Sequence, residues 1–147
     1  MSEQAAWQRL QPFVDRVIPR AVKQGLAGLP EKDQTLFLVW SATAEFDNGG
    51  FAQFFYNTVG EHSKAAVSAF RRIGAEQVAE LLEQAIEIFP DSVVPADLDE
   101  RNEALGELPE SADDRFQELD DQFQSIGSDP VMDQLANYYL DRRDGAA

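Results

Sequence analysis

Few side chains in this sequence do acid–base or covalent chemistry near neutral pH, because histidine occurs once, as His62, and cysteine is absent. A catalytic triad or a zinc site needs several such groups in one place. One stretch beginning at Asp97 has the alternating acids of a calcium-binding loop. However, Arg101 and Asn102 occupy the ligand and glycine positions, and Leu108 replaces the bidentate glutamate. We therefore expect no enzymatic activity, no cofactor and no metal site.

The abundant chemical groups are carboxylates. The 147 residues include 27 acidic and 12 basic ones, for a formal net charge of −15. Residues 1–89 carry a net charge of −3, whereas residues 90–147, with 16 acids and 4 bases, carry −12. Such a field repels nucleic acid and anionic membranes and attracts basic proteins. We expect a basic protein as the partner, with no direct nucleic-acid binding and no membrane binding.

Two expected helices arrange acids in rows, and no Lys or Arg interrupts residues 73–100, which hold the first row. The first row comprises Glu76, Glu80, Glu83 and Glu87, and the second Asp113, Asp114, Glu118 and Asp121. Rows of this kind are either solvated faces that aid solubility or a binding surface for a basic protein. Exposed helices usually mix charge signs, because oppositely charged side chains at i and i+4 stabilise the helix. The lack of such pairs in these rows favours the binding surface as a candidate site.

Apolar residues recur at helical spacing throughout, and neither strand alternation nor an internal repeat is present. Helices are predicted over residues 1–24, 31–46, 61–73, 76–89, 113–126 and from Pro130 to near Arg142-Arg143, with a short one near 100–105 inside the loop 90–112. Pro12 and Pro19 should break or kink the first helix, and Asp129 should cap the last. The fold class is all-α, a single-domain compact bundle of about six to eight helices spanning residues 1–147.

The stretch from Glu45 to Gly60 is aromatic and rich in glycine. Asn48, Gly49 and Gly50 should stop a helix, because these residues tolerate positive φ. The rings of Phe51, Phe54 and Phe55 then share one helical face, and Gln53, Tyr56 and Asn57 another. In the favoured interpretation the rings fill the core, and Gln53 and Asn57 satisfy backbone groups at helix ends. Alternatively, the polar side is a small pocket, and the chain is a small-molecule-binding or enzymatic domain.

The pattern Glu45-x-x-Asn48-Gly49-Gly50-Phe51-x-Gln53-Phe54-Phe55-x-Asn57-x-x-Gly60, with the later Phe116-x-x-Leu119 and Tyr138-Tyr139, resembles the DNA-mimic-protein family of bacterial helical domains over about residues 30–142. The resemblance implies an all-helical fold, with residues 1–29 as an N-terminal helix and connector. It also implies a dimer that presents carboxylates like duplex phosphates to the DNA-binding face of a transcription factor. The motif residues mark the fold and are mainly structural, so mimicry depends on this chain's own acids.

The expected function is an acidic, non-catalytic binding protein, a DNA mimic that occupies the basic surface of a transcription factor or nucleoid protein. An immunity-type inhibitor of a basic nuclease toxin is an alternative with the same charge logic. The N-terminus lacks the basic-then-apolar pattern of a secretion signal, and no apolar run reaches the length of a membrane span. A cytoplasmic location is therefore expected.

Overall fold

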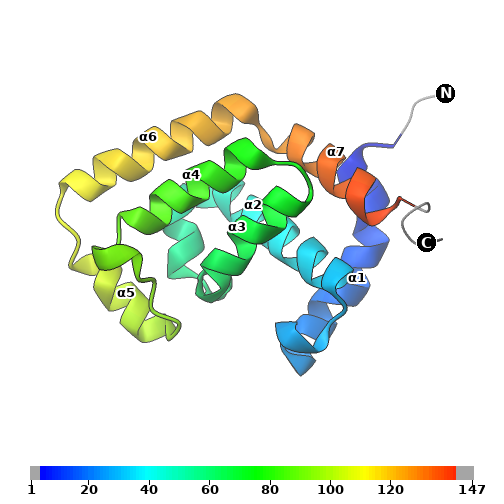
Figure 1. Cartoon of the computed structure of the whole chain (residues 1–147), viewed down its shortest axis with the longest axis horizontal. Helices are drawn as coiled ribbons and strands as arrows, with labels where there is room; N and C mark the ends of the chain where they lie inside the picture. The colour runs from blue at the N-terminus through cyan, green and yellow to red at the C-terminus, as the bar shows by residue number, and fades with distance from the viewer. Residues whose placement is uncertain (1–3, 142–147) are drawn as a thin grey trace.

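Apolar residues at helical spacing form seven α-helices within residues 4–141, the part of the chain that this computed structural model describes (Figure 1). No strand occurs in that range, and the predicted all-α fold is confirmed. The α-helices are α1 (Ala6–Gln24), α2 (Glu31–Tyr56), α3 (Ser63–Arg72), α4 (Glu76–Glu87), α5 (Leu98–Gly106), α6 (Ser111–Ile126) and α7 (Ser128–Tyr139). Short 3-10 helices η1 (Leu26–Gly28), η2 (Thr58–His62) and η3 (Pro90–Ser92) lie in the connections.

Helix α2 is the centre of the bundle. It packs against α1, α3, α5, α6 and α7, and α4 lies between α3 and α6 (Figure 1). The side chains of Leu36, Val39 and Ala42 have no exposed surface. A helix that is apolar on most of its circumference must be covered on every side, which explains the central position of α2.

Helix α1 runs unbroken through two prolines, so the predicted break at Pro12 and Pro19 is wrong. Both prolines lie on the exposed side of α1. Each removes one helical hydrogen bond, and the carbonyls left without a partner belong to the exposed residues Gln8 and Asp15. Water can bind these carbonyls, so the lost bonds do not end the helix.

The helix was predicted to stop at Asn48, Gly49 and Gly50, but only Gly50 departs from helical geometry. Helix α2 kinks there and then continues to Tyr56. Gly50 has φ 83° and ψ −170°, a conformation that a side chain would strain. Its neighbour Phe51 donates its backbone N–H to Asp120 Oδ1 of α6 at 2.8 Å. A carboxylate from another helix thus replaces the bond that the kink removes.

Phenylalanine rings fill the space that the kink creates. Phe51, Phe54 and Phe55 are fully buried, and Phe46 lies 4.4 Å from Phe51 between ring centroids. Phe55 packs edge-on against Phe89, with 4.8 Å between centroids. Edge-on and tilted pairs of this kind add to the stabilisation from burial alone.

The junction between α6 and α7 differs from the sequence prediction by two residues. Gly127 has φ 84° and ψ 160°, and it occupies the N-cap position of α7. Helix α7 therefore begins at Ser128, and Asp129 lies in its first turn instead of capping it. The helix ends at Tyr139, and the predicted end near Arg142-Arg143 lies outside the described residues.

Candidate functional site

The residues of the Glu45–Gly60 motif hold the two halves of kinked α2 together. Glu45 Oε2 accepts hydrogen bonds from Gln53 Nε2, at 3.0 Å, and from Asn57 Nδ2. The two amides therefore bind a carboxylate across the kink, and the predicted bonds to helix-end backbone groups are wrong. The carboxylate can bind both amides because the kink at Gly50 brings the end of α2 back toward Glu45.

Arg101 of α5 is the most deeply buried charged residue among those described, with no exposed surface. Its Nε donates to Phe55 O at 2.7 Å, and its Nη2 donates to Asn57 O at 2.8 Å. Nη1 donates to the carbonyls of Pro95 and Ala96. Burial lowers the pKa of this guanidinium. Arg101 thus joins the end of α2 to the start of α5.

Position 60 requires glycine because the backbone there packs closely against Phe54 and Arg101. A Cβ at this position would lie 2.7 Å from Phe54 O and 3.0 Å from Arg101 Nε. A side chain there would force the backbone away from the guanidinium. In the sequence, Arg101 stands out only as a residue that is incompatible with a calcium-binding loop. The one signal that could have identified it is a lone base within the long acidic segment 90–112.

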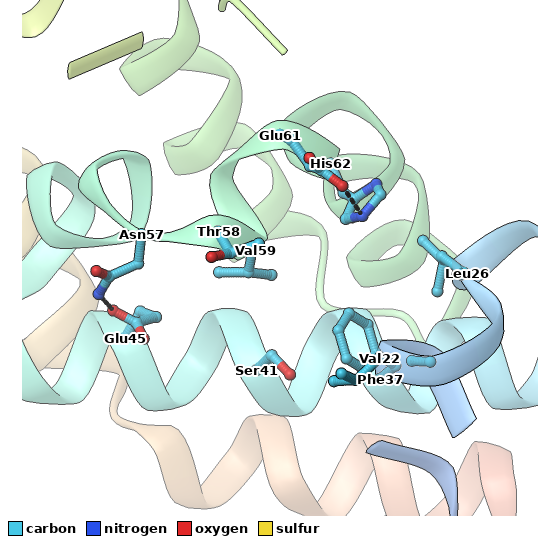
Figure 2. A pocket seen from close by; sticks show the side chains of 12 residues that line it. Val22, Leu26, Phe37, Ser41, Glu45, Asn57, Thr58, Val59, Glu61 and His62 are labelled. Atoms are coloured by element: carbon cyan, nitrogen blue, oxygen red, sulfur yellow. Dashed lines mark hydrogen bonds and ion pairs between the residues drawn. The ribbon is translucent and has the colours of Figure 1, made fainter. Parts of the chain in front are cut away.

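A cleft of about 680 Å³ lies between the end of α1, η1, α2 and η2 (Figure 2). Asn57 and Glu45 line it, whereas Gln53 and Tyr56 do not, so the structure brings only one of the three predicted pocket residues to this cleft. The other lining residues comprise an apolar wall of Val22, Leu26, Phe37 and Val59, and polar groups of Ser41, Thr58, Glu61 and His62.

His62 lies at the rim of this cleft. Its Nε2 is 2.8 Å from Glu61 Oε1, and the two side chains are 29% and 41% exposed. Within residues 4–141, no hydroxyl or amine is hydrogen-bonded to His62, so no nucleophile is placed for it to activate as a base. Nor do the described His, Asp and Glu side chains form any group that could hold a metal ion.

The predicted acidic row on α4 is half neutralised, which corrects the view of it as free of cations. Arg71 of α3 pairs with Glu76 at 3.0 Å and also with Glu83. These two carboxylates raise the pKa of Arg71, Glu83 most. The sequence conceals this pairing because Arg71 reaches α4 across the turn at Gly74. Glu80 and Glu87 remain exposed, without a hydrogen bond or ion pair to any described residue.

The predicted row on α6 is also partly paired. Arg115 contacts Glu118 at 3.0 Å and donates to Gln84 of α4. Asp121 accepts a hydrogen bond from Gln117 at 2.9 Å. Asp113 and Asp114, in the first turn, are exposed and have no such partner among the described residues. Of the eight predicted surface acids, the structure therefore leaves Asp113 and Asp114 in the most negative surroundings.

Those surroundings form a patch that we call the α5–α6 acidic end. It lies at one end of the molecule, on α5, the connection after it and the first turn of α6 (Figure 1). Its members are Asp97, Asp99, Glu100, Glu103, Glu107, Glu110, Asp113 and Asp114, all exposed. Arg101, the only base in this segment, is buried and bound to carbonyls, so it balances none of the surface charge. The excess of acid in this half is visible in the sequence, but the predicted site lay on the rows of α4 and α6 and shares only Asp113 and Asp114 with this patch.

The fold and this surface define a class: an all-helical, acidic domain. None of its helices within residues 4–141 is long and apolar enough to span a membrane. A family described as DMP19-like protein matches residues 27–143, and the chain belongs to this family. No curated protein and no solved structure matches the chain.

This assignment corrects the resemblance drawn from the sequence. That resemblance defined the family by DNA mimicry and by the motif Asn-Gly-Gly-Phe-x-Gln-Phe-Phe. The match instead supports membership of the DMP19-like family over residues 27–143, and it gives no information about that motif. In this chain the motif's contacts are internal, as the bonds of Glu45 and the packing of Gly60 show.

Proposed function

We propose that this protein is an acidic, non-catalytic binding protein whose α5–α6 acidic end occupies the basic, DNA-binding surface of another protein. The observation that carries the proposal is the exposure of eight carboxylates over α5 and the start of α6, while Arg101, the only base within residues 97–114, is turned inward. Membership of the DMP19-like family supports it. A surface of this kind attracts a basic partner over a distance and repels nucleic acid.

The acidic side chains at the C-terminal end of α5 destabilise the helix. Negative side chains near a helix C-terminus are unfavourable, because the backbone dipole is negative there. Glu103 and Glu107 lie in the last turn of α5 and just after it, four residues apart, so they also repel each other. None of α4, α5, α6 and α7 has a base in its last turn, whereas α1 and α3 do. Helix stability therefore does not explain this charge, which supports a role in recognising a cationic surface.

The spacing of the acids suits a polyanion mimic. Glu110, Asp114, Glu118 and Asp121 recur at i, i+4, i+8 and i+11 along α6, which places a carboxylate about every 5–6 Å along the axis. A basic groove shaped for the regular charges of a duplex would therefore meet a regular series of carboxylates.

The proposal is tested by capture of proteins already selected for DNA binding. Proteins eluted from DNA–cellulose are passed at low salt over the immobilised chain, and bound proteins are released by a salt step and identified. We expect a DNA-binding protein that free duplex DNA prevents from binding. Recovery of a toxin nuclease would assign the immunity-type alternative, and retention unaffected by DNA would contradict mimicry.

A matched pair of variants assigns the surface. Glu103→Gln/Glu107→Gln removes two charges from the acidic end, and Asp15→Asn/Asp133→Asn removes two exposed charges from α1 and α7. The first variant should lose retention at a lower salt concentration than the second. Equal retention of the two would remove the α5–α6 acidic end from the mechanism.

A second candidate function, small-molecule binding, is favoured by the cleft that Asn57 and Glu45 line. Its volume of about 680 Å³ falls within the usual range for ligand sites. A ligand bound there should raise the melting temperature of the wild type but not that of Asn57→Ala. A ligand that stabilises both equally binds elsewhere.

A further inference from the structure

A smaller hollow, of about 340 Å³, lies where α1, α2 and α7 meet, and it shares no lining residue with the acidic end or with the cleft of Figure 2. Trp7 of α1 and Trp40 of α2 line it, and they are the only tryptophans of the chain. Trp7 is 47% exposed, an unusual state for a large apolar ring. We call this site the tryptophan hollow.

The other residues that line the tryptophan hollow include two aspartates and a methionine. Asp47 of α2 and Asp129 of α7 both line it, are exposed and have no hydrogen bond or ion pair with a described residue. The thioether of Met132, a buried residue, forms another part of the lining. No Lys or Arg lines the hollow among the described residues.

The two indole rings carry no cation of the protein itself. Within residues 4–141, Arg16 lies over the ring of Phe13, and Lys32 lies near the rings of Tyr138 and Tyr139, but no such contact involves a tryptophan. Indole has the strongest attraction for cations of the aromatic side chains. Two indoles and two carboxylates around one hollow are a chemical match to an organic cation.

Two further observations bear on the occupant. The positive end of the α7 dipole faces Asp129, in the first turn, so that carboxylate is partly offset and Asp47 supplies most of the remaining negative charge. Thr43, which is 3% exposed, lines the hollow, and its Oγ1 is buried with no hydrogen-bond partner among the described residues. Buried polar atoms in this state are usually satisfied by a bound group or water.

We propose that the tryptophan hollow binds an alkylammonium ion, with its charge between the indoles and Asp47 and its alkyl part against Met132. An anion would meet two carboxylates, and a neutral apolar ligand would remove their water without compensation. The same ammonium chemistry is carried by a free amine and by a lysine side chain. The volume of the hollow is suited to either.

Tryptophan fluorescence tests the proposal directly, since both tryptophans of the protein line the site. The wild type is titrated with n-butylammonium chloride up to about 50 mM at constant ionic strength, with n-pentanol as the neutral control. We expect saturable quenching or a spectral shift with the amine only, and an upfield shift of the amine's methyl signal in NMR spectra from the indole ring currents. No saturable change, or the same change with n-pentanol, would overturn the proposal.

Variants and a second probe complete the test. Asp47→Asn should weaken butylammonium binding about five-fold or more, whereas the exposed control Asp133→Asn, elsewhere on α7, should leave it unchanged. Equal weakening in both variants would contradict the assignment to this hollow. A lysine-containing peptide that binds more tightly than butylammonium identifies a protein side chain as the source, and a weaker peptide identifies a free amine. Loss of partner capture by the acidic end would not affect any of these results.

Discussion

At the scale of single residues, Asp120 explains how the kink in α2 is tolerated. Its carboxylate accepts the N–H of Phe51, a fully buried residue, at 2.8 Å. Burial raises the pKa of Asp120, the bond from Phe51 opposes this shift, and the neighbouring Asp121 adds to it. Asp120 therefore has two opposing effects on the folded state. Its hydrogen bond to Phe51 stabilises the kink, whereas burial makes its charged form unfavourable.

Substitutions of Asp120 should separate these two effects. Asp120→Ala leaves the buried N–H of Phe51 without a partner and should lower the free energy of unfolding by about 1–3 kcal/mol. Asp120→Asn keeps an acceptor and removes the charge, so it should be much less destabilising at pH 7. Urea denaturation of the three proteins measures both values, and equal losses in the two variants would contradict the role of the bond.

The raised pKa of Asp120 also predicts a pH dependence with a definite sign. A folded-state pKa above the unfolded value means that the folded state binds the proton more tightly. The contribution of Asp120 to stability is therefore largest below the unfolded pKa, near 4, and is lost as the pH rises through the folded pKa. The stability of wild type relative to Asp120→Asn should thus increase as the pH falls from 7 to about 4. A relative decrease over that range, in denaturation at matched pH, would contradict it.

Arg101 is the second residue with a large expected effect. Arg101→Ala removes the donors for the carbonyls of Phe55 and Asn57 and leaves a cavity, so the loss of stability should exceed about 3 kcal/mol. Arg115→Ala removes a partly exposed guanidinium that bonds only to the side chains of Glu118 and Gln84, so it should change stability by about 0.5 kcal/mol or less. Thermal denaturation of the two variants makes the comparison. A mild effect of Arg101→Ala would mean that the α2–α5 junction does not depend on it.

At the scale of helices, the kink at Gly50 should not accept a side chain. Alanine at φ 83° costs about 1–2 kcal/mol, and its Cβ would lie 2.3 Å from Asp120 Oδ2. Gly50→Ala should therefore be strongly destabilising. Gly106→Ala is the matched control, because no atom lies within 4 Å of a Cβ there and α5 should gain helical propensity. Melting temperatures that fall equally in both variants would contradict the geometry of the kink.

Helix α5 supplies a prediction that separates stability from binding. Glu103→Gln/Glu107→Gln removes two like charges from the negative end of a helix dipole and should raise stability by about 0.5–1 kcal/mol. Chemical denaturation at low ionic strength measures the change, which salt should reduce. A clear loss of stability would mean that the two carboxylates have structural partners.

Helix type and position were largely predictable from the sequence, since apolar spacing alone locates α4, α6 and most of α2. Long-range polar contacts were not. The bond from Phe51 to Asp120 spans 69 positions, and nothing in either local sequence indicates it. The prolines of α1 were misleading because local rules do not show which face of a helix meets water.

The candidate surface was predictable in part, for the same reason. The excess of acid in residues 90–147 is a property of composition and is visible in the sequence. Which acids remain free depends on where the few bases point. Arg71 crosses to α4 and pairs with Glu76 and Glu83, while Arg101 turns into the core, and only tertiary structure determines either outcome.

At the scale of the whole molecule, charge is distributed by element. The exposed bases of the N-terminal half lie on α1 and α3, and some pair with acids, as Arg72 does with Glu31 at 3.1 Å. At the other end, α5 and the first turn of α6 present carboxylates without an exposed base between them until Arg115. The molecule therefore has one strongly negative end, and the proposed basic partner would be oriented by it before contact.

Displacement of a fluorescent DNA duplex from the captured DNA-binding protein tests this account most directly. The wild-type chain should displace the duplex completely and less effectively as salt rises. Glu103→Gln/Glu107→Gln should need about tenfold more protein, a change of about 1.4 kcal/mol, while Asp15→Asn/Asp133→Asn should match the wild type. A duplex that stays bound at saturating wild-type chain, or equal displacement by the two double variants, would contradict the proposed role of the α5–α6 acidic end.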